Sequence, residues 1–301
     1  MQTLRNEILR HLPHGNNARR LFHGRGHCFP GYEDIIIDAY PPLVMVILHR
    51  QRVEEWLVEL VELLLELPHP PETILLQERF RTGAPSRLLH GEWPEELDAH
   101  EDGLRFRLRL GEAQNVGFFP DMAAGRALVR ERARGKKVLN LFAYTCGFSV
   151  AALAGGAEMV VNLDMNRGAL ELGKLNHELN GLDLRKASFL ALEFFRSRGR
   201  LRKIGPFDLV ICDPPASQGE SFTASRHWPK LIRSLSELIA PGGELLACLN
   251  APDLGPAYLD DLFASEFPKA QRLSVRRLDD DFPEADPEAG VSLHLYRSPG
   301  T

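Results

Sequence analysis

The chain has 301 residues, of which 44% are hydrophobic and 26% charged, and its formal net charge is −5. This length allows a large core and two domains, and the net charge does not indicate a nucleic-acid partner, although a local basic face would suffice to bind one. Four widely spaced cysteines without a CxxC motif indicate neither a zinc site nor a disulfide framework. The sequence has no signal region and no apolar run of about 18 residues. We therefore expect a soluble protein of the reducing cytoplasm, with no membrane segment and no bound metal.

The first third of the chain contains short strand candidates around one long helix. Residues 53–67 have apolar side chains at helical spacing, with glutamates largely on the opposite face, and a shorter helix is expected over residues 1–10. Strands are expected at residues 20–23, 35–38, 43–48, 73–77, 87–89 and 104–110. This pattern predicts a small α+β domain in residues 1–111, a candidate for binding RNA or another substrate.

The remaining residues, 112–301, alternate helices with strands. Helices are predicted at residues 121–134, 148–154, 166–180, 189–198, 228–239 and 257–264. Strands are predicted at residues 138–142, 159–163, 184–187, 207–212, 245–249, 272–276 and 291–296. The connection between the last two strands is too short for a crossover helix, so this pair is expected to be antiparallel. The pattern predicts an α/β domain with a doubly wound, mostly parallel, Rossmann-like sheet and a terminal antiparallel hairpin.

The prediction of a ligand rests on residues 138–164, which form a strand, a turn, a short helix and a second strand ending at Asp164. Backbone N–H groups at the start of such a helix favour an anion, and an acid at the end of the second strand accepts hydrogen bonds from ribose hydroxyls. The turn contains one glycine, Gly147, and lacks the GxGxxG motif that brings a pyrophosphate close to the backbone. The unit therefore predicts a nucleoside ligand without pyrophosphate, which favours S-adenosylmethionine over NAD or FAD.

A second motif, Asp213-Pro214-Pro215, follows the predicted buried strand at residues 207–212. Consecutive prolines fix φ and restrict the preceding residue to an extended conformation. They hold the Asp213 carboxylate at the carboxyl end of the sheet, next to the switch point where ligands bind. An acceptor there orients an amino or N–H group for attack on a methyl sulfonium, and this chemistry requires neither a metal nor a covalent intermediate.

These motifs carry a family resemblance. The segments NLFAYTCGF (140–148), ICDPP (211–215) and NVGFFPDMAAGR (115–126) resemble the bacterial S-adenosylmethionine-dependent 23S rRNA methyltransferases, which modify cytosine-5 or guanine-N7. The likeness extends through EDGLRFRLRLG (101–111) and the acidic loop DDDFPEADPEAG (279–290). Five alternating β/α units followed by a hairpin also match the class I methyltransferase core. The resemblance implies S-adenosylmethionine as cofactor and RNA, above all 23S rRNA, as partner, and it leaves a homodimer open.

The resemblance also implies roles for individual residues. Tyr144, Thr145, Gly147 and Phe148 would wrap the methionine part of the cofactor, and Asp164 would hold its ribose. The full candidate set for cofactor binding is Asp121, Arg126, Phe142, Tyr144, Thr145, Gly147, Phe148, Asp164, Met165, Ser188 and Phe189.

Several positions depart from the family pattern. Cys146 stands where a glycine is usual, Ala123 replaces an arginine, and Ser188-Phe189 lies where an acid usually contacts adenine. Ala216-Ser217 replaces the aromatic residue that stacks on the target base, so stacking would have to come from another aromatic side chain. The candidates for that role are Phe118, Phe222 and Trp228.

The cysteines distinguish the two chemistries of the family. Methylation at cytosine-5 needs a thiolate that attacks C6 of the ring, and Asn250 occupies the place of that cysteine here. Cys248 and Cys212 lie within strand candidates and are expected to be buried structural thiols. We therefore favour methylation of a nitrogen, with Asp213, Pro214, Pro215 and Asn250 as the catalytic set.

Other interpretations remain open at this point. The same cofactor would serve methylation of a small molecule or a protein, the same scaffold would serve an NAD-dependent oxidoreductase, and the altered residues are compatible with a non-catalytic RNA-binding or assembly module. Two basic clusters, residues 126–137 and 196–203, either follow a phosphate backbone or are solvated helix faces. The scattered histidines, among them His177, are expected to be non-catalytic.

Overall fold

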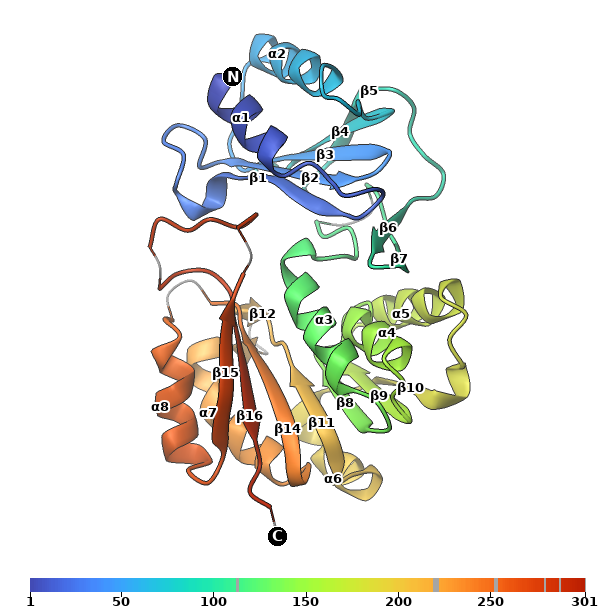
Figure 1. The fold of residues 1–301 in the computed structure, drawn as a ribbon, viewed down its shortest axis with the longest axis vertical. Helices are drawn as coiled ribbons and strands as arrows, with labels where there is room; N and C mark the ends of the chain where they lie inside the picture. The colour runs from blue at the N-terminus through green and yellow to red at the C-terminus, as the bar shows by residue number, and fades with distance from the viewer. Residues whose placement is uncertain (112–113, 219–221, 252–253, 279, 287, 301) are drawn as a thin grey trace. The chain divides into compact units, whose positions relative to one another are not determined.

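A computed structural model describes the chain except for residues 112–113, 219–221, 252–253, 279, 287 and 301. The chain divides into two compact units (Figure 1). The first unit comprises Met1–Asp121 and Asp279–Asp286, and the second comprises Met122–Leu278 and Pro287–Thr301. The domain boundary that the sequence predicts between residues 111 and 112 refers to domains that fold independently. It stays a prediction.

The first unit is built on a five-stranded sheet in the order β1-β2-β3-β4-β5. Its strands are Arg19–His23, Ile35–Tyr40, Leu43–Leu48, Thr73–Glu78 and Ser86–His90. Two helices, α1 (Gln2–Arg10) and α2 (Glu54–Leu65), pack on one face of this sheet through buried leucine and isoleucine side chains. A small hairpin, β6 (Asp98–Glu101) and β7 (Leu104–Arg107), completes the unit. The predicted α+β pattern is confirmed, although β6 was not predicted.

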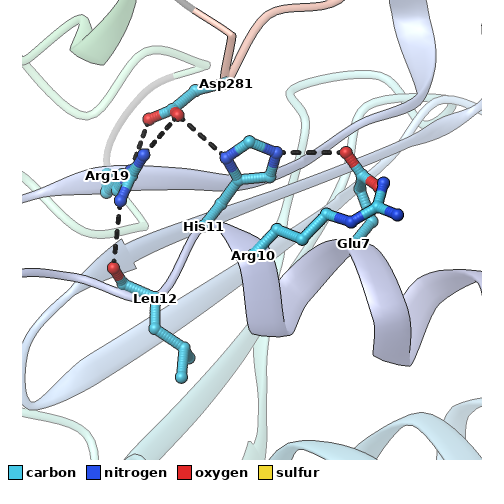
Figure 2. A network of polar contacts seen from close by, with 6 residues as sticks. All are labelled: Glu7, Arg10, His11, Leu12, Arg19 and Asp281. Carbon is cyan, nitrogen blue, oxygen red and sulfur yellow. Dashed lines mark hydrogen bonds and ion pairs between the residues drawn. The ribbon is translucent and has the colours of Figure 1, made fainter.

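An acidic segment from late in the chain belongs to this first unit (Figure 2). Asp281 accepts hydrogen bonds from Nε and Nη2 of Arg19 at 2.6 and 2.7 Å, and it lies 2.9 Å from Nδ1 of His11. The other ring nitrogen of His11 lies 3.0 Å from a carboxylate oxygen of Glu7. Asp281 and His11 are largely shielded from solvent, so the loop between the last two strands is bound to α1 and β1 by partly buried charges.

The second unit contains a seven-stranded sheet in the order β10-β9-β8-β11-β14-β16-β15. The parallel strands are β8 (Lys137–Leu141), β9 (Met159–Asp164), β10 (Ala187–Ala191), β11 (Phe207–Cys212) and β14 (Ile239–Leu249). The strands β15 (Gln271–Arg277) and β16 (Ser292–Arg297) form the predicted antiparallel pair. A short hairpin, β12 (Ser217–Gln218) and β13 (Phe222–Thr223), follows β11. The chain reverses its winding direction at β8, so the predicted doubly wound architecture is confirmed.

Helices cover both faces of this sheet (Figure 1). On one face α3 (Ala123–Arg132) and α4 (Gly147–Ala154) pack through buried apolar side chains, and α5 (Arg167–Leu179) lies beside α4. On the other face lie α6 (Phe194–Ile204), α7 (Ala224–Ser236) and α8 (Ala257–Glu266). The strand side chains alternate between the two cores, as expected for a sheet buried on both sides.

One stretch of the predicted order is wrong. Residues 184–187 were expected to form a strand, but Leu184–Lys186 is a 3-10 turn because the Asp183 side chain accepts a hydrogen bond from the Arg185 N–H. The strand β10 begins only at Ala187, and α6 begins at Phe194 rather than at residue 189. The reason is Glu193, whose carboxylate accepts hydrogen bonds from the N–H groups of Phe195 and Arg196.

The helix α7 begins at Ala224, four residues before its predicted start, and contains Pro229. A proline within a helix leaves the carbonyl four residues earlier without its usual N–H donor. Here that carbonyl belongs to Ser225, and the Tyr258 hydroxyl of α8 donates to it at 3.0 Å. This side-chain donor explains how the helix continues through the proline.

We expect the substitution Asp281→Ala to lower the free energy of unfolding by about 2 kcal/mol, because it leaves the partly buried Arg19 guanidinium without its carboxylate. Urea denaturation of the full chain measures this change. Asp280→Ala is the matched control, since Asp280 is exposed and its loss should cost less than about 0.5 kcal/mol. Equal effects of the two substitutions would contradict the importance of the ion pair.

Candidate active site

The candidate site begins at the carboxyl edge of the parallel sheet. The strand β8 is paired in register with β9 on one side and with β11 on the other. The residues at or just beyond the ends of these strands, Asp164, Phe142 and Asp213, therefore form one row across the switch point. Two strand spacings separate the backbones of the two acids by about 10 Å, so the row brings two carboxylates to either side of the loop after β8.

The Asp164 carboxylate binds that loop directly. One oxygen accepts the Tyr144 backbone N–H at 2.8 Å, and the other accepts the Asn166 backbone N–H at 2.7 Å. Both donors are backbone groups, so the carboxylate is held in a fixed orientation. An ionised carboxylate offers about four acceptor positions, which leaves Asp164 able to accept hydrogen bonds from two ribose hydroxyls. Met165, the next residue, is 51% exposed.

The loop itself has an unusual backbone. Phe142, Tyr144 and Cys146 have φ values of +56°, +46° and +61°, a region that costs residues other than glycine about 1 to 2 kcal/mol each. The N–H groups of Ala143, Tyr144 and Cys146 donate within the protein, whereas the start of α4, which directly follows the loop, has no side-chain cap and presents its N–H groups to an anion. Strain of this kind gathers at functional sites, so the loop is a candidate for holding a carboxylate of a ligand.

Cys146 shows why a glycine is usual at its position. Its φ of +61° is one that glycine adopts without cost, and its side chain is completely buried. Space for the thiol comes from Gly173 of α5, where an added Cβ would lie 2.4 Å from the sulfur. The departure from the family pattern is thus matched by a small residue on the facing helix.

A buried chain of polar side chains lies beneath the loop. Asn140 Nδ2 donates to Asn162 Oδ1 at 2.9 Å, and Asn162 Nδ2 donates to Ser149 Oγ at 3.0 Å. Ser149 Oγ lies 2.8 Å from His177 Nε2, and His177 Nδ1 lies 2.7 Å from the Gly173 carbonyl oxygen. The carbonyl is an acceptor only, so Nδ1 carries the proton and Ser149 donates to Nε2. The chain joins β8, β9, α4 and α5.

This arrangement requires His177 to be neutral. Burial lowers the pKa of His177 below its ordinary value, and the Gly173 carbonyl opposes this only in part. Next to the histidine, Asn176 Nδ2 donates to the Thr145 carbonyl at 3.0 Å. The helix α5 thereby supports the loop after β8 from below. Asn140 Oδ1 is buried and has no hydrogen-bond partner in the part of the chain that the structure describes.

The other candidate cofactor residues lie in different surroundings. Phe148 is buried in α4, and its ring lies 3.1 Å from where a Cβ at Gly125 of α3 would be. Arg126 is buried within α3, in the second unit, whereas Asp121 lies at the end of the first unit and acts electrostatically on Arg20. Their roles in cofactor binding stay predictions.

The register of β10 bears on the expected adenine contact. Ala191 pairs with Asp164, whereas Ser188 and Phe189 pair with Val161 and Asn162 further back in the sheet. The Phe189 ring packs edge-on against His177, 5.3 Å between centroids. The residues beside Asp164 at the sheet edge are therefore Ala191 and Leu192, which the misplaced strand at residues 184–187 concealed. The roles of Ser188 and Phe189 remain untested predictions.

The candidate catalytic residues occupy the other side of the row. Asp213 follows β11 directly and is half-buried, and Pro214 is buried behind it. Asn250 follows β14 and is exposed. Cys212 and Cys248 are both completely buried, and burial followed by the Asp213 charge raises the pKa of Cys212 well above its ordinary value. Neither thiol is placed to act as a thiolate nucleophile.

The aromatic residues considered for base stacking are all buried. Phe118 packs against Phe106 in the first unit, and Trp228 is only 1% exposed. Phe222 contacts the Phe142 ring at 5.4 Å and stacks on His227 at 5.1 Å. These contacts connect the hairpin after Asp213 to the loop after β8, but they leave no open ring face on Phe222 for a base.

The first basic cluster is largely structural. Arg132 and Lys136 contact Glu244 at 3.1 and 2.9 Å, at the amino end of the sheet and away from Asp164. Burial alone would raise the pKa of Glu244, but hydrogen bonds from Lys136 and Arg297 hold it below its ordinary value. In the second cluster Arg196, Arg200 and Lys203 are exposed on α6, and their contact with RNA stays a prediction.

The residues present suit S-adenosylmethionine. Asp164 has spare acceptor capacity at the expected ribose position, and the uncapped start of α4 offers backbone N–H groups without pyrophosphate glycines. Within the described ranges, no three His, Cys, Asp or Glu side chains are grouped to hold a metal ion. Likewise, none of the helices placed there is sufficiently long and apolar to cross a membrane.

Comparison with known proteins agrees with this site. A family model described as S-adenosylmethionine-dependent methyltransferase matches residues 19–297. The chain belongs to this family. A solved structure, SMU.776, described as a methyltransferase complexed with SAH, is 26% identical, with a TM-score of 0.84 over 94% of this chain and 75% of that one. The expected fold class and cofactor are thereby confirmed.

Curated relatives carry a more specific name. Ribosomal RNA large subunit methyltransferase I of Vibrio cholerae is 33% identical over 81% of this chain and 64% of its own length. Its counterpart in Aeromonas salmonicida is 36% identical over 55% of this chain and 42% of its own length. The chain thus spans between about two fifths and two thirds of these curated relatives. A tRNA m1G37 methyltransferase from M. jannaschii, 19% identical with a TM-score of 0.61, shares the fold.

The polar chain beneath the loop was not predicted from the sequence, although a signal for it existed. Asn140 and Asn162 interrupt strands that are otherwise apolar, and a buried amide must find hydrogen-bond partners. The pairing of Asn140 with Asn162 in the parallel register was therefore foreseeable. The contributions of Ser149 and His177 were not, because they depend on how α4 and α5 pack.

We expect Asp164→Asn to raise the Kd for S-adenosylhomocysteine at least about tenfold, because it removes a charge-assisted acceptor. The amide also presents an NH2 group to one of the two backbone N–H donors. Isothermal titration calorimetry measures the change. Asp183→Asn, the same substitution in a nearby turn, should leave the affinity unchanged, and equal affinities for Asp164→Asn and the unaltered protein would contradict the assignment.

We expect the free energy of unfolding to fall as the pH is lowered below about 6.5, the ordinary pKa of histidine. In this range the unfolded chain takes up a proton on His177 that the folded chain, with its lowered pKa, does not. His177→Gln removes this uptake and should flatten the slope of unfolding free energy against pH between 7.5 and 5.5. Histidines elsewhere titrate equally in both proteins, so identical slopes would show that His177 is not held neutral.

Proposed function

We propose that this protein is an enzyme that transfers the methyl group of S-adenosylmethionine to a base in RNA, with 23S rRNA as the first substrate to examine. The observation that carries the proposal is the row of Asp164, the strained loop and Asp213 at the switch point of a chain that belongs to this family. The names of the curated relatives support ribosomal RNA as substrate. A cytoplasmic location follows from that substrate, and a homodimer remains an expectation that light scattering would test.

The cofactor supplies an electrophilic methyl group, and the chain's residues position it. Asp164, already fixed by two backbone N–H groups, would accept hydrogen bonds from the ribose. The N–H groups at the start of α4, which the Cys146 side chain does not cap, would receive the carboxylate of the methionine part. Glycine at residue 147, where α4 begins, lets the ligand approach the helix start closely.

On the other side of the row, Asp213 would receive the acceptor base. Its carboxylate leaves β11 through two prolines that fix the backbone direction. A carboxylate held in this way accepts a hydrogen bond from an amino or ring N–H group and stabilises the positive charge that develops on the nitrogen. Asn250, exposed after β14, would supply a further amide contact to the base.

The burial of the thiols supports a nitrogen as the methylated atom. Cytosine-5 methylation begins with attack by a thiolate, which needs an accessible thiol of lowered pKa. Cys212, Cys248 and Cys146 are completely buried, and burial raises the pKa of Cys212 and of Cys146. An acceptor acid without a nucleophilic thiol fits direct transfer to nitrogen.

Family membership removes the NAD-dependent oxidoreductase interpretation, and two alternatives remain as outcomes of experiment. Methylation of a small molecule or a protein uses the same cofactor side and differs only in the acceptor. A non-catalytic RNA-binding or assembly module would bind RNA without transferring a methyl group.

We expect labelled S-adenosylmethionine to methylate 23S rRNA from a strain that lacks this protein, with the product at a guanine nitrogen by mass mapping. Asp213→Asn should reduce kcat by about 100-fold or more, because it removes the charged acceptor. It should leave the Kd for S-adenosylhomocysteine unchanged, since Asp213 lies on the acceptor side.

Cys248→Ala is the control that separates the two chemistries. Retained activity is expected for nitrogen methylation, whereas its loss with an unchanged fold would point to a thiol adduct. Methyl transfer to free nucleosides or protein but not to rRNA would favour the alternative substrates. RNA binding without any transfer would favour the non-catalytic module.

A further inference from the structure

The arginines of the first unit are nearly all paired. From residue 5 to residue 107, arginine side chains within 4.0 Å of a carboxylate oxygen are those of Arg5, Arg10, Arg19, Arg20, Arg50, Arg52, Arg81, Arg87, Arg105 and Arg107. Two arginines, Arg25 and Arg79, have no such partner among the described residues. Arg25 and Arg79 therefore differ from the other arginines of this range, because no described carboxylate neutralises their charge.

Arg79 is bound only to neutral groups in the described part of the chain. Its Nε donates to Gln77 Oε1 at 3.0 Å, and its Nη2 donates to the Gln114 carbonyl at 2.9 Å and to Asn115 Oδ1 at 3.3 Å. Burial lowers the pKa of Arg79, and the charge of Asp38, which is bound by Arg20, opposes this only in part. These contacts orient the guanidinium but do not neutralise its charge, so it can still bind an anion.

Arg25 is exposed and rigidly presented. It lies in the 3-10 turn Gly24–Gly26 between β1 and β2. A Cβ at Gly24 would lie 1.9 Å from the Tyr32 carbonyl oxygen, and one at Gly26 would lie 1.7 Å from the Pro283 carbonyl oxygen. The turn is therefore packed so closely on both sides that only glycine fits around Arg25. Its backbone is held in place while its side chain extends to the surface.

The backbone segments that carry Arg25 and Arg79 both lie close to His49. The strands β3 and β4 are in register up to Leu48 and Glu78, so His49 and Arg79 are neighbours at the same end of the sheet. On the side of Arg25, the His49 N–H donates to the Asp34 carbonyl at 2.8 Å, and a Cβ at Gly24, next to Arg25, would lie 2.7 Å from the Ile35 carbonyl oxygen. Burial and then the charges of Arg25 and Arg79 lower the pKa of His49 to about 4. His49 is thus neutral near pH 7 and does not add repulsion between the two arginines.

The nearby acids are engaged elsewhere. Asp34 lies beside His49 and is bound by Arg50 and Arg52, and Asp38 is bound by Arg20. Glu284 interacts electrostatically with Arg25, but burial has the larger effect and raises the pKa of Glu284; within the described residues its carboxylate makes no ion pair with Arg25. The local charge of Arg25 and Arg79 therefore remains available for an outside anion.

We propose that Arg25 and Arg79 form a phosphate-binding site on the first unit, which holds a backbone phosphate of the RNA substrate. The site rests on the proposed function, since it assigns the ligand from the substrate class. A guanidinium is the group best matched to a phosphate because its planar fork donates two parallel hydrogen bonds. Contacts of this kind position a nucleic acid without reading its sequence.

The test measures binding of a 23S rRNA transcript by the full chain across a series of NaCl concentrations. Arg25→Gln and Arg79→Gln should each weaken binding about tenfold at low salt. Each should also reduce the slope of log Kd against log salt by about 0.7 to 0.9, the value for one lost phosphate contact. Arg87→Gln is the matched control, because Arg87 is paired with Glu54 and should change neither quantity. Arg79→Lys keeps the charge without the fork and should fall between.

The outcomes separate this site from the proposed function. Calorimetry with S-adenosylhomocysteine should give the same Kd for every variant, and equal melting temperatures exclude unfolding. If neither substitution alters the salt dependence of RNA binding or the methylation of RNA, the phosphate site alone is overturned. An unaltered protein that binds S-adenosylhomocysteine but shows no RNA affinity at low salt would overturn both proposals. Phosphorus NMR measures the binding of inorganic phosphate. If the two substitutions abolish this binding but leave RNA binding unchanged, the arginines bind a free anion, and the proposed RNA contact is overturned.

Discussion

The hydrogen bonds between the Asp164 carboxylate and two backbone N–H groups determine the shape of the candidate cofactor site. Three residues of the loop after β8 are held at positive φ, at about 1 to 2 kcal/mol each. One of the two hydrogen bonds, from the Tyr144 N–H, reaches this loop. A hydrogen bond to a charged acceptor contributes about 1.5 to 3 kcal/mol, so it offsets the strain of about one of these three residues. The Asp164 carboxylate therefore supplies part of the stabilisation that the loop conformation needs. The residue expected to bind the ribose is also the residue that shapes the surface around it.

The second support comes from beneath, and its physical basis is different. The chain from Asn140 to His177 has a defined direction, because each donor has one acceptor and the last acceptor is a backbone carbonyl. A buried polar network is favourable only when its members are satisfied, and a protonated His177 would break this order at Ser149. Burial keeps the imidazole neutral, so the packing of α5 and the hydrogen-bond order depend on each other.

Much of the second unit could be predicted because its signals are local. Asp164 and Asp213 each follow an apolar strand, so their places at the sheet edge follow from strand length alone. Residues 184–193 were misassigned because two acidic side chains, Asp183 and Glu193, cap turns that apolar patterning does not reveal. The contact of Asp281 with Arg19 joins positions 262 residues apart, and no local pattern encodes it. For the same reason, only the folded structure shows that Arg25 and Arg79 have no carboxylate partner among the residues that it describes.

The acceptor side of the site is best understood through charge. Transfer of a methyl group from a sulfonium to a neutral nitrogen moves one positive charge onto the base, and an anion fixed nearby stabilises that charge as it develops. Cys212 precedes Asp213 directly, and a thiolate there would place two negative charges on consecutive residues at the end of a buried strand. Burial and the Asp213 carboxylate keep this thiol protonated, so Asp213 carries the negative charge at the end of β11. The single negative charge of Asp213, next to the nitrogen that becomes positive, suits methylation of nitrogen. Methylation of a ring carbon would instead need an ionised thiol as nucleophile.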